Sequence, residues 1–281
     1  MKLIYTLLFG ATLFAFNNTS AQDLTMVASA PVGLKIDGKL NEFTDSLTAY
    51  DKTTKLYYHV AHDDKNIYVF LKANKPMEQN KILAGGVSIS ANPTGKKKQM
   101  GIVTFPLMDK NAMMTEMRNR FSQSQRPAGD ATTRVEKTPE QRQKEIEELR
   151  KASLAKLKEI KVEGFKEITE EKISIYNTYG IKTGINYDSK NALIYEVAIP
   201  LALLNLTANE EFALNIKLNG IEFPESGSGM GGGGMGGMGG GYGGGGGGYG
   251  GGGGQRGGNS GMDYMSLFSP TEMWLKAKLS K

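Results

Sequence analysis

Alternating apolar and polar residues predict strands along most of this chain. The stretch Ile67–Leu71 is apolar at every position, as expected of a central strand that is covered on both faces. Residues 87–90 and 100–105 are joined by the turn sequence Asn92-Pro93-Thr94-Gly95, which predicts a hairpin. Period-two alternation is also clear in four further segments: 56–62, 193–200, 212–218 and 273–279. Many strands separated by turns predict an all-β fold, specifically an antiparallel β-sandwich.

One segment has helical spacing instead. Thr138 is a candidate N-cap, Pro139 suits the first helical position, and Gln141 completes a capping box. Apolar side chains then recur on one face as far as Ile160. We therefore predict one inserted α-helix, which forms the second half of a loop-plus-helix insertion at residues 109–160. The helix can pack on its own sheet or serve a partner, and packing on its own domain is the commoner arrangement.

A second insertion is predicted at residues 226–261, which hold 25 of the 37 glycines, interspersed with Met and Tyr. Such a composition buries too little apolar surface to offset the entropy lost on ordering, so we expect a disordered Gly-rich loop. It lies between two predicted strands and is therefore a loop and not a tail. Two interpretations remain: a linker of variable length, or a tether whose Tyr and Met side chains contact a partner.

The start of the chain predicts export. Lys2 is followed by a short apolar run to Phe16 and by small residues before Gln22, so residues 1–21 resemble a secretory signal peptide. The mature protein is then expected in the periplasm, on the cell surface or secreted. Residues 22–281 are predicted to form the β-sandwich domain with its two insertions. No segment of the mature chain has the roughly 20 apolar residues of a transmembrane helix.

The composition further narrows the classes of function that this chain can have. The formal charge is +5, with acidic and basic residues intermixed, and the only tight basic cluster is Lys96-Lys97-Lys98 beside a turn. A nucleic-acid partner is therefore not expected, because such proteins concentrate Lys and Arg on one stripe. The chain has no Cys, which removes disulfides and thiol nucleophiles.

Catalytic and cofactor motifs are missing from the sequence. His59 and His62, the only histidines, are three residues apart on a predicted strand and point to opposite faces, so they do not chelate one metal. No nucleophile elbow, phosphate loop or zinc-ligand spacing is present. We therefore predict a protein that is not an enzyme and holds no metal or other cofactor. Haem remains a minor alternative, because the chain holds 14 Met beside these two histidines.

Four short motifs carry a family resemblance. They are Asp37-Gly38-Lys39-Leu40, the turn and strand from Asp63 to Leu71, Tyr195-Glu196-Val197-Ala198-Ile199-Pro200-Leu201, and the final strand. In that order they resemble the family 9 carbohydrate-binding modules and their DOMON-like relatives, which are secreted β-sandwiches. The motifs span most of the mature chain but neither insertion. The signal peptide, ending Ser-Ala-Gln, is similar to those of Bacteroidota envelope proteins.

The resemblance implies a sugar site lined by aromatic side chains, which stack on the apolar face of a pyranose. The family generally uses tryptophans, whereas this chain has only Trp274, so tyrosines must take the remaining places. The candidate ligand-binding residues are Trp274, Tyr57, Tyr68 and Tyr176. The predicted function is therefore non-catalytic binding of a carbohydrate or a cell-envelope component. The alternative is a structural or assembly protein that holds envelope proteins through the Gly-rich loop and the helix.

Overall fold

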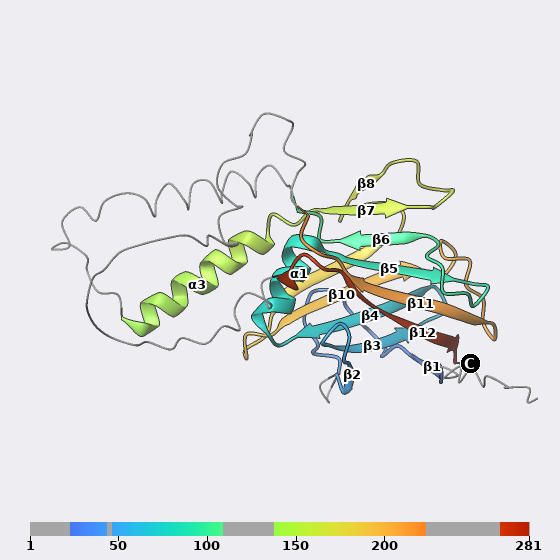
Figure 1. The fold of residues 1–281 in the computed structure, drawn as a ribbon, viewed down its shortest axis with the longest axis horizontal. Helices are drawn as coiled ribbons and strands as arrows, with labels where there is room; N and C mark the ends of the chain where they lie inside the picture. The colour runs from blue at the N-terminus through green and yellow to red at the C-terminus, as the bar shows by residue number, and fades with distance from the viewer. Residues whose placement is uncertain (1–22, 44–46, 109–137, 223–264, 281) are drawn as a thin grey trace, which may run out of the picture.

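The structure, a computed structural model, describes residues 23–43, 47–108, 138–222 and 265–280. The predicted signal peptide (1–21), the Gly-rich loop (226–261) and the first part of the other insertion (109–137) lie outside these residues. The described chain is mostly β, with two helices (Figure 1). Its elements are β1 (Leu24–Ser29), β2 (Ala49–Asp51), β3 (Leu56–His62), β4 (Asn66–Ala73), α1 (Pro76–Gly85), β5 (Val87–Asn92), β6 (Ile102–Phe105), α3 (Pro139–Leu154), β7 (Glu159–Glu163), β8 (Lys172–Ser174), β9 (Lys182–Tyr187), β10 (Leu193–Pro200), β11 (Glu211–Leu218) and β12 (Thr271–Leu279).

The strands form one large mixed sheet in the order β8-β7-β6-β5-β11-β12-β1-β3-β4-β10-β9, with β2 paired to β3. The sheet curls strongly, so that β4 and β10 lie behind β5 and β11 in Figure 1. This corrects the predicted architecture, because two separate antiparallel layers were expected. The strand β1 is the reason that the two halves form one sheet. Its residues Leu24–Val27 pair parallel to β12, and Ala28 and Ser29 pair parallel to β3, so one strand joins the two halves.

A single main core lies inside the curl. The predicted alternation holds on both halves: Val69 of β4, Ile89 of β5 and Leu214 of β11 are all fully buried in it. The strand β4 is buried on both faces, as predicted from its unbroken apolar run. Its other face, with Tyr68 and Phe70, forms a smaller cluster that is covered by side chains from residues 30–43. The final strand β12 also enters the core as expected, between β11 and β1.

The inserted helix α3 begins as predicted. Thr138 Oγ1 accepts a hydrogen bond from the Gln141 N–H at 3.3 Å, and Gln141 Oε1 accepts one from the Thr138 N–H at 2.9 Å. The predicted end at Ile160 is wrong, because the helix ends at Leu154. Ile160 belongs to β7, where it is fully buried opposite Ile173. Burial in the core outweighed the helical spacing of that side chain.

The predicted packing of α3 on its own domain is slight. No side chain of the helix is buried, and Ile146 and Leu149 are 43% and 62% exposed. Arg150 contacts the sheet region, since its guanidinium lies 4.3 Å from the ring centre of Tyr187 on β9 and donates a hydrogen bond to Asn191 Oδ1. The short helix α1 was not predicted, and it fills the link from β4 to β5. Within the described ranges, neither helix is long and apolar enough to span a membrane.

Candidate functional site

The outer face of β6, β5, β11 and β12 carries an ordered set of polar side chains. Because alternate residues of these strands point into the core, the intervening residues point outward together. The strand registers align them in two cross-strand rows. The first row is Thr104, Ser88, Lys217 and Glu272, and the second row is Ile102, Ser90, Asn215 and Trp274. The sequence from β6 to β12 thus places hydroxyl, amide, charged and aromatic groups on one surface.

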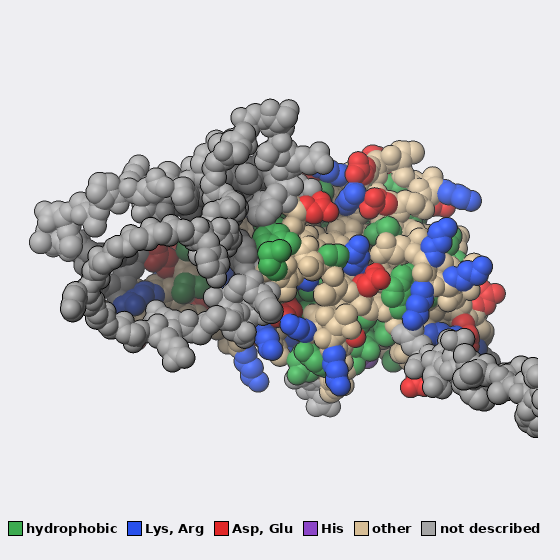
Figure 2. All heavy atoms as spheres, viewed as in Figure 1, with side chains coloured by type: hydrophobic (Ala, Val, Ile, Leu, Met, Phe, Trp, Pro, Cys, Tyr) green, Lys and Arg blue, Asp and Glu red, His purple; other side chains and the backbone are tan. Residues whose placement is uncertain are grey.

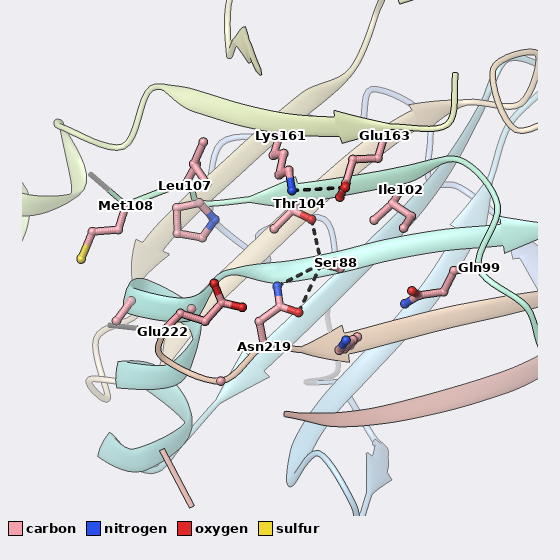
Figure 3. A pocket seen from close by; sticks show the side chains of 15 residues that line it. Ser88, Gln99, Ile102, Thr104, Leu107, Met108, Lys161, Glu163, Asn219 and Glu222 are labelled. Carbon is pink, nitrogen blue, oxygen red and sulfur yellow. Dashed lines mark hydrogen bonds and ion pairs between the residues drawn. The ribbon is translucent and has the colours of Figure 1, made fainter. Parts of the chain in front are cut away.

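A pocket of about 260 Å³ lies over the first row. Figure 3 shows Ser88 and Thr104 at its floor, Asn219 on one side and Lys161 with Glu163 on the other. Leu107 and the neighbouring Pro106 add an apolar wall. The pocket therefore combines hydrogen-bonding groups with a smaller apolar surface, a mixture that suits a small polar ligand.

The floor of the pocket is preorganised. The hydroxyls of Ser88 and Thr104 are 2.7 Å apart, and the Asn219 Nδ2 donates to Ser88 Oγ at 2.9 Å. Ser88 and Thr104 are each only 7% exposed, so their positions are fixed by the sheet and by this network. At the end of β11, Asn219 is held by its own backbone, because its N–H donates to Gly86 O at 3.1 Å. A ligand would therefore meet groups that are already aligned.

The charges around the pocket are balanced. Lys161 Nζ lies 3.2 Å from Glu163 Oε1 and 3.5 Å from Glu171 Oε1. Partial burial opposes the charge of Lys161, but these two carboxylates together raise the pKa of its ammonium group. Lys217 and Glu222 add one charge of each sign. Figure 2 shows that acidic and basic side chains are interspersed on the visible face of the molecule, without a continuous field of one sign.

A chain of hydrogen bonds links the pocket to the second row. Gln99, which lines the pocket, donates through Nε2 to Asn215 Oδ1 at 2.7 Å. Asn215 is fully buried and donates through Nδ2 to Glu272 Oε2 at 3.1 Å. The other oxygen of Glu272 accepts a hydrogen bond from Trp274 Nε1 at 3.2 Å. The indole edge of Trp274 is therefore anchored to the same network that reaches the pocket.

The four predicted ligand-binding residues do not come together. Trp274 is half-buried and lies on the outer face just described. Tyr57 and Tyr68 belong to the smaller cluster on the other half of the sheet, where Tyr57 packs against Tyr50. Tyr176 is 77% exposed in the turn after β8, at one edge of the sheet. Only Trp274 is placed near the pocket.

Tyr68 has a structural role in its cluster. It is 8% exposed, and its hydroxyl donates to Asp63 Oδ2 at 2.6 Å. Burial, together with that hydrogen bond, raises the pKa of Tyr68 to about 12. The same carboxylate accepts hydrogen bonds from the Lys65 and Asn66 amides through Oδ1, so Asp63 and Tyr68 fasten the turn between β3 and β4.

The pocket residues Ser88, Thr104 and Gln99, and Asn215 in the second row, were not predicted as site residues. Part of the signal was available, because Val87-Ser88-Ile89-Ser90 alternates and therefore places its serines on the outer face. The predicted hairpin places β6 beside β5, but the sequence does not show that β11 lies on the other side of β5. The neighbours β6 and β11 are 102–105 and 211–218, and only their registers bring Ser88 opposite Thr104 and Lys217.

A second polar feature is buried beneath the motif Asp37-Gly38-Lys39-Leu40. Glu196 of β10 is fully buried, and its Oε2 accepts hydrogen bonds from the Asp37 and Gly38 N–H groups, each at 2.9 Å. Its Oε1 is buried without a partner among the described residues. Burial raises the pKa of Glu196 to about 7. The two amide hydrogen bonds oppose this rise, whereas the nearby charges of Asp37 and Glu42 add to it. This carboxyl group joins two of the sequence motifs that were noticed separately.

The described residues contain no group of three or more His, Asp or Glu side chains arranged to hold a metal ion. His59 packs against Phe43, and His62 Nε2 lies 3.0 Å from Ser280 Oγ. The two histidines therefore have separate surroundings, as their spacing predicted. No family model, curated protein or solved structure matches this chain.

Proposed function

We propose that this chain is an exported, non-catalytic binding protein that takes a carbohydrate on the outer face of β6, β5, β11 and β12. The observation that carries the proposal is the pocket over Ser88, Thr104 and Asn219, with its preorganised floor and balanced charge. Hydroxyl, amide and charged groups that converge on one surface match the hydroxyl groups of a sugar. The nearby Trp274 offers an aromatic ring of the kind that stacks on a pyranose.

The architecture supports this proposal by analogy. We propose that the curled sheet is a variant of the β-sandwich that family 9 carbohydrate-binding modules and DOMON-like proteins have, with β1 shared by both halves. Its two halves face each other across one core, as the layers of a sandwich do. The Asp37-Gly38 turn and Glu196 belong to two of the four motifs that carry the family resemblance, and they contact each other directly.

A glycan array followed by isothermal titration calorimetry tests the proposal. Asn219→Ala removes the amide that holds Ser88 Oγ and should weaken binding of any sugar found on the array by about tenfold, the equivalent of one lost hydrogen bond. Lys182→Ala is the matched control, because Lys182 is exposed on β9, at the opposite edge of the sheet. Absence of binding to every sugar, or equal binding by the Asn219→Ala variant, would refute this assignment of the site.

One observation favours the alternative, an assembly protein of the cell envelope. The helix α3 buries none of its side chains, and Ile146 and Leu149 are exposed three residues apart on one face. Deleting residues 226–261 separates the two functions, because a sugar site on β5 and β11 would survive, whereas a tether would lose its envelope partner in a pull-down. Ile146→Glu with Leu149→Glu tests the helix in the same assay.

A further inference from the structure

The second row of the outer face lies beyond the pocket, and its geometry bears on the size of the ligand. Trp274 lies directly opposite Asn215, and Lys217 is two residues further along β11. The Cα atoms of Trp274 and Ser88 are separated by two strand spacings across the sheet and by two residues along it, a distance of about 12 Å. A single pyranose ring is smaller than this distance. One monosaccharide therefore cannot contact both the pocket floor and the indole.

We propose that this face binds an uncharged oligosaccharide of at least two units, laid across the strands from the pocket over Ser88 to the ring of Trp274. This inference rests on the proposed function. The hydrogen bonds from Gln99 through Asn215 and Glu272 to Trp274 run along that path without a break. They fix the edge of the indole before any ligand arrives, so little conformational entropy is lost at Trp274 on binding.

The charges along the path indicate an uncharged chain. Lys161 is compensated by Glu163 and Glu171, and Glu272 is engaged by Asn215 and Trp274. Lys217, which lies in the first row between Ser88 and Glu272, forms no ion pair with any described residue, so its ammonium group can donate to sugar hydroxyls. Because the side chains that line the pocket include both signs, Lys161 and Lys217 with Glu163 and Glu222, a polyanionic or polycationic glycan would meet repulsion as well as attraction.

The test uses the fluorescence of Trp274, the only tryptophan in the chain. The protein is titrated with neutral oligosaccharides of one series, from monosaccharide to hexasaccharide, chosen from the glycans that bind on the array. We expect the affinity to rise by about tenfold or more from monosaccharide to trisaccharide and then to level off, with a shift in tryptophan emission only for the longer sugars.

The variant Trp274→Ala, followed by calorimetry, should lose that gain, so that its affinity no longer rises from monosaccharide to trisaccharide. Trp274→Phe should retain part of it, because the ring is kept. Lys278→Ala, on the same outward face of β12, is the matched control for folding and for nonspecific effects. Any of three results would overturn the inference while the proposed sugar binding stands. They are equal affinity for mono- and trisaccharide, a length dependence that survives in Trp274→Ala, and tighter binding of a uronic-acid oligomer. Absence of binding to any sugar would instead refute the proposed function.

Discussion

The substitution Glu196→Gln tests how the Asp37-Gly38 turn is held to the sheet. The Glu196 carboxyl group has no exposed surface, accepts two backbone hydrogen bonds through Oε2 and leaves Oε1 buried without a described partner. Glutamine keeps the size and an oxygen that can accept both N–H groups. It removes the negative charge, which is unfavourable here because the group is buried and lies close to Asp37 and Glu42.

The expected magnitude follows from the raised pKa. Glu196 has a pKa of about 7 in the folded protein against an ordinary value of 4.5. Between these values the folded state holds more protons than the unfolded state, so the stability contributed by this group falls as the pH rises. At about 1.4 kcal/mol for each pKa unit, the loss between pH 4.5 and pH 7 is about 3 kcal/mol. Above the folded pKa the loss is complete.

Urea unfolding of the wild-type protein and of Glu196→Gln across this pH range measures the effect. The free energy of unfolding of the variant, relative to wild type, should rise with pH by about 3 kcal/mol and then level off. Taking the difference between the two proteins cancels the contribution of other titrating groups, such as His59, whose pKa is lowered by burial. Glu167→Gln, at an exposed carboxylate, is the control for the Glu-to-Gln substitution itself. A constant difference between wild type and Glu196→Gln would refute the argument that a buried charge forms above pH 7.

Three other substitutions test contacts elsewhere in the fold. Gly184→Ala should destabilise the protein by about 1–3 kcal/mol in urea unfolding, because a Cβ there would lie 2.5 Å from the backbone nitrogen of Gly38. Unchanged stability would show that the Asp37-Gly38 turn packs less closely on β9. Lys81→Met should cost about 1–3 kcal/mol in the same assay, because the Lys81 Nζ donates to Ser269 O at 2.7 Å just before β12, and unchanged stability would contradict this anchoring role. Thr138→Ala should cost about 1 kcal/mol of helix stability, seen as lost far-ultraviolet dichroism, and an unchanged spectrum would mean that the capping box does not hold α3.

The strands with local signatures could be predicted from the sequence. The two-sided burial of Ile67–Leu71, the hairpin of β5 and β6 and the inward face of β12 each follow from the alternation of a few neighbouring residues. The cap of α3 is equally local, since Thr138 and Gln141 are three residues apart. These features depend on backbone geometry within one element, which periodicity reports directly.

Features set by distant contacts could not be predicted in this way. The parallel pairing of β1 with β12 joins the two ends of the described chain, and no local pattern distinguishes it from the expected antiparallel layers. The helix α1 was missed because it buries polar side chains, among them Glu78 and Lys81, and has no side-chain N-cap. The candidate site shows the same limit, because Ser88, Asn215 and Trp274 share a face only through the order and register of the strands.

The location of the bound sugar tests the central claim most directly. Backbone amide chemical shifts, recorded while an array-positive oligosaccharide is added, map the contact surface residue by residue. The proposed site predicts that the largest changes fall on Ser88, Thr104, Asn215 and Lys217 and at Trp274, with little change on β3 and β4. Changes centred on Tyr57 and Tyr68, or on α3, would contradict the assignment of the site to the outer face of β5 and β11.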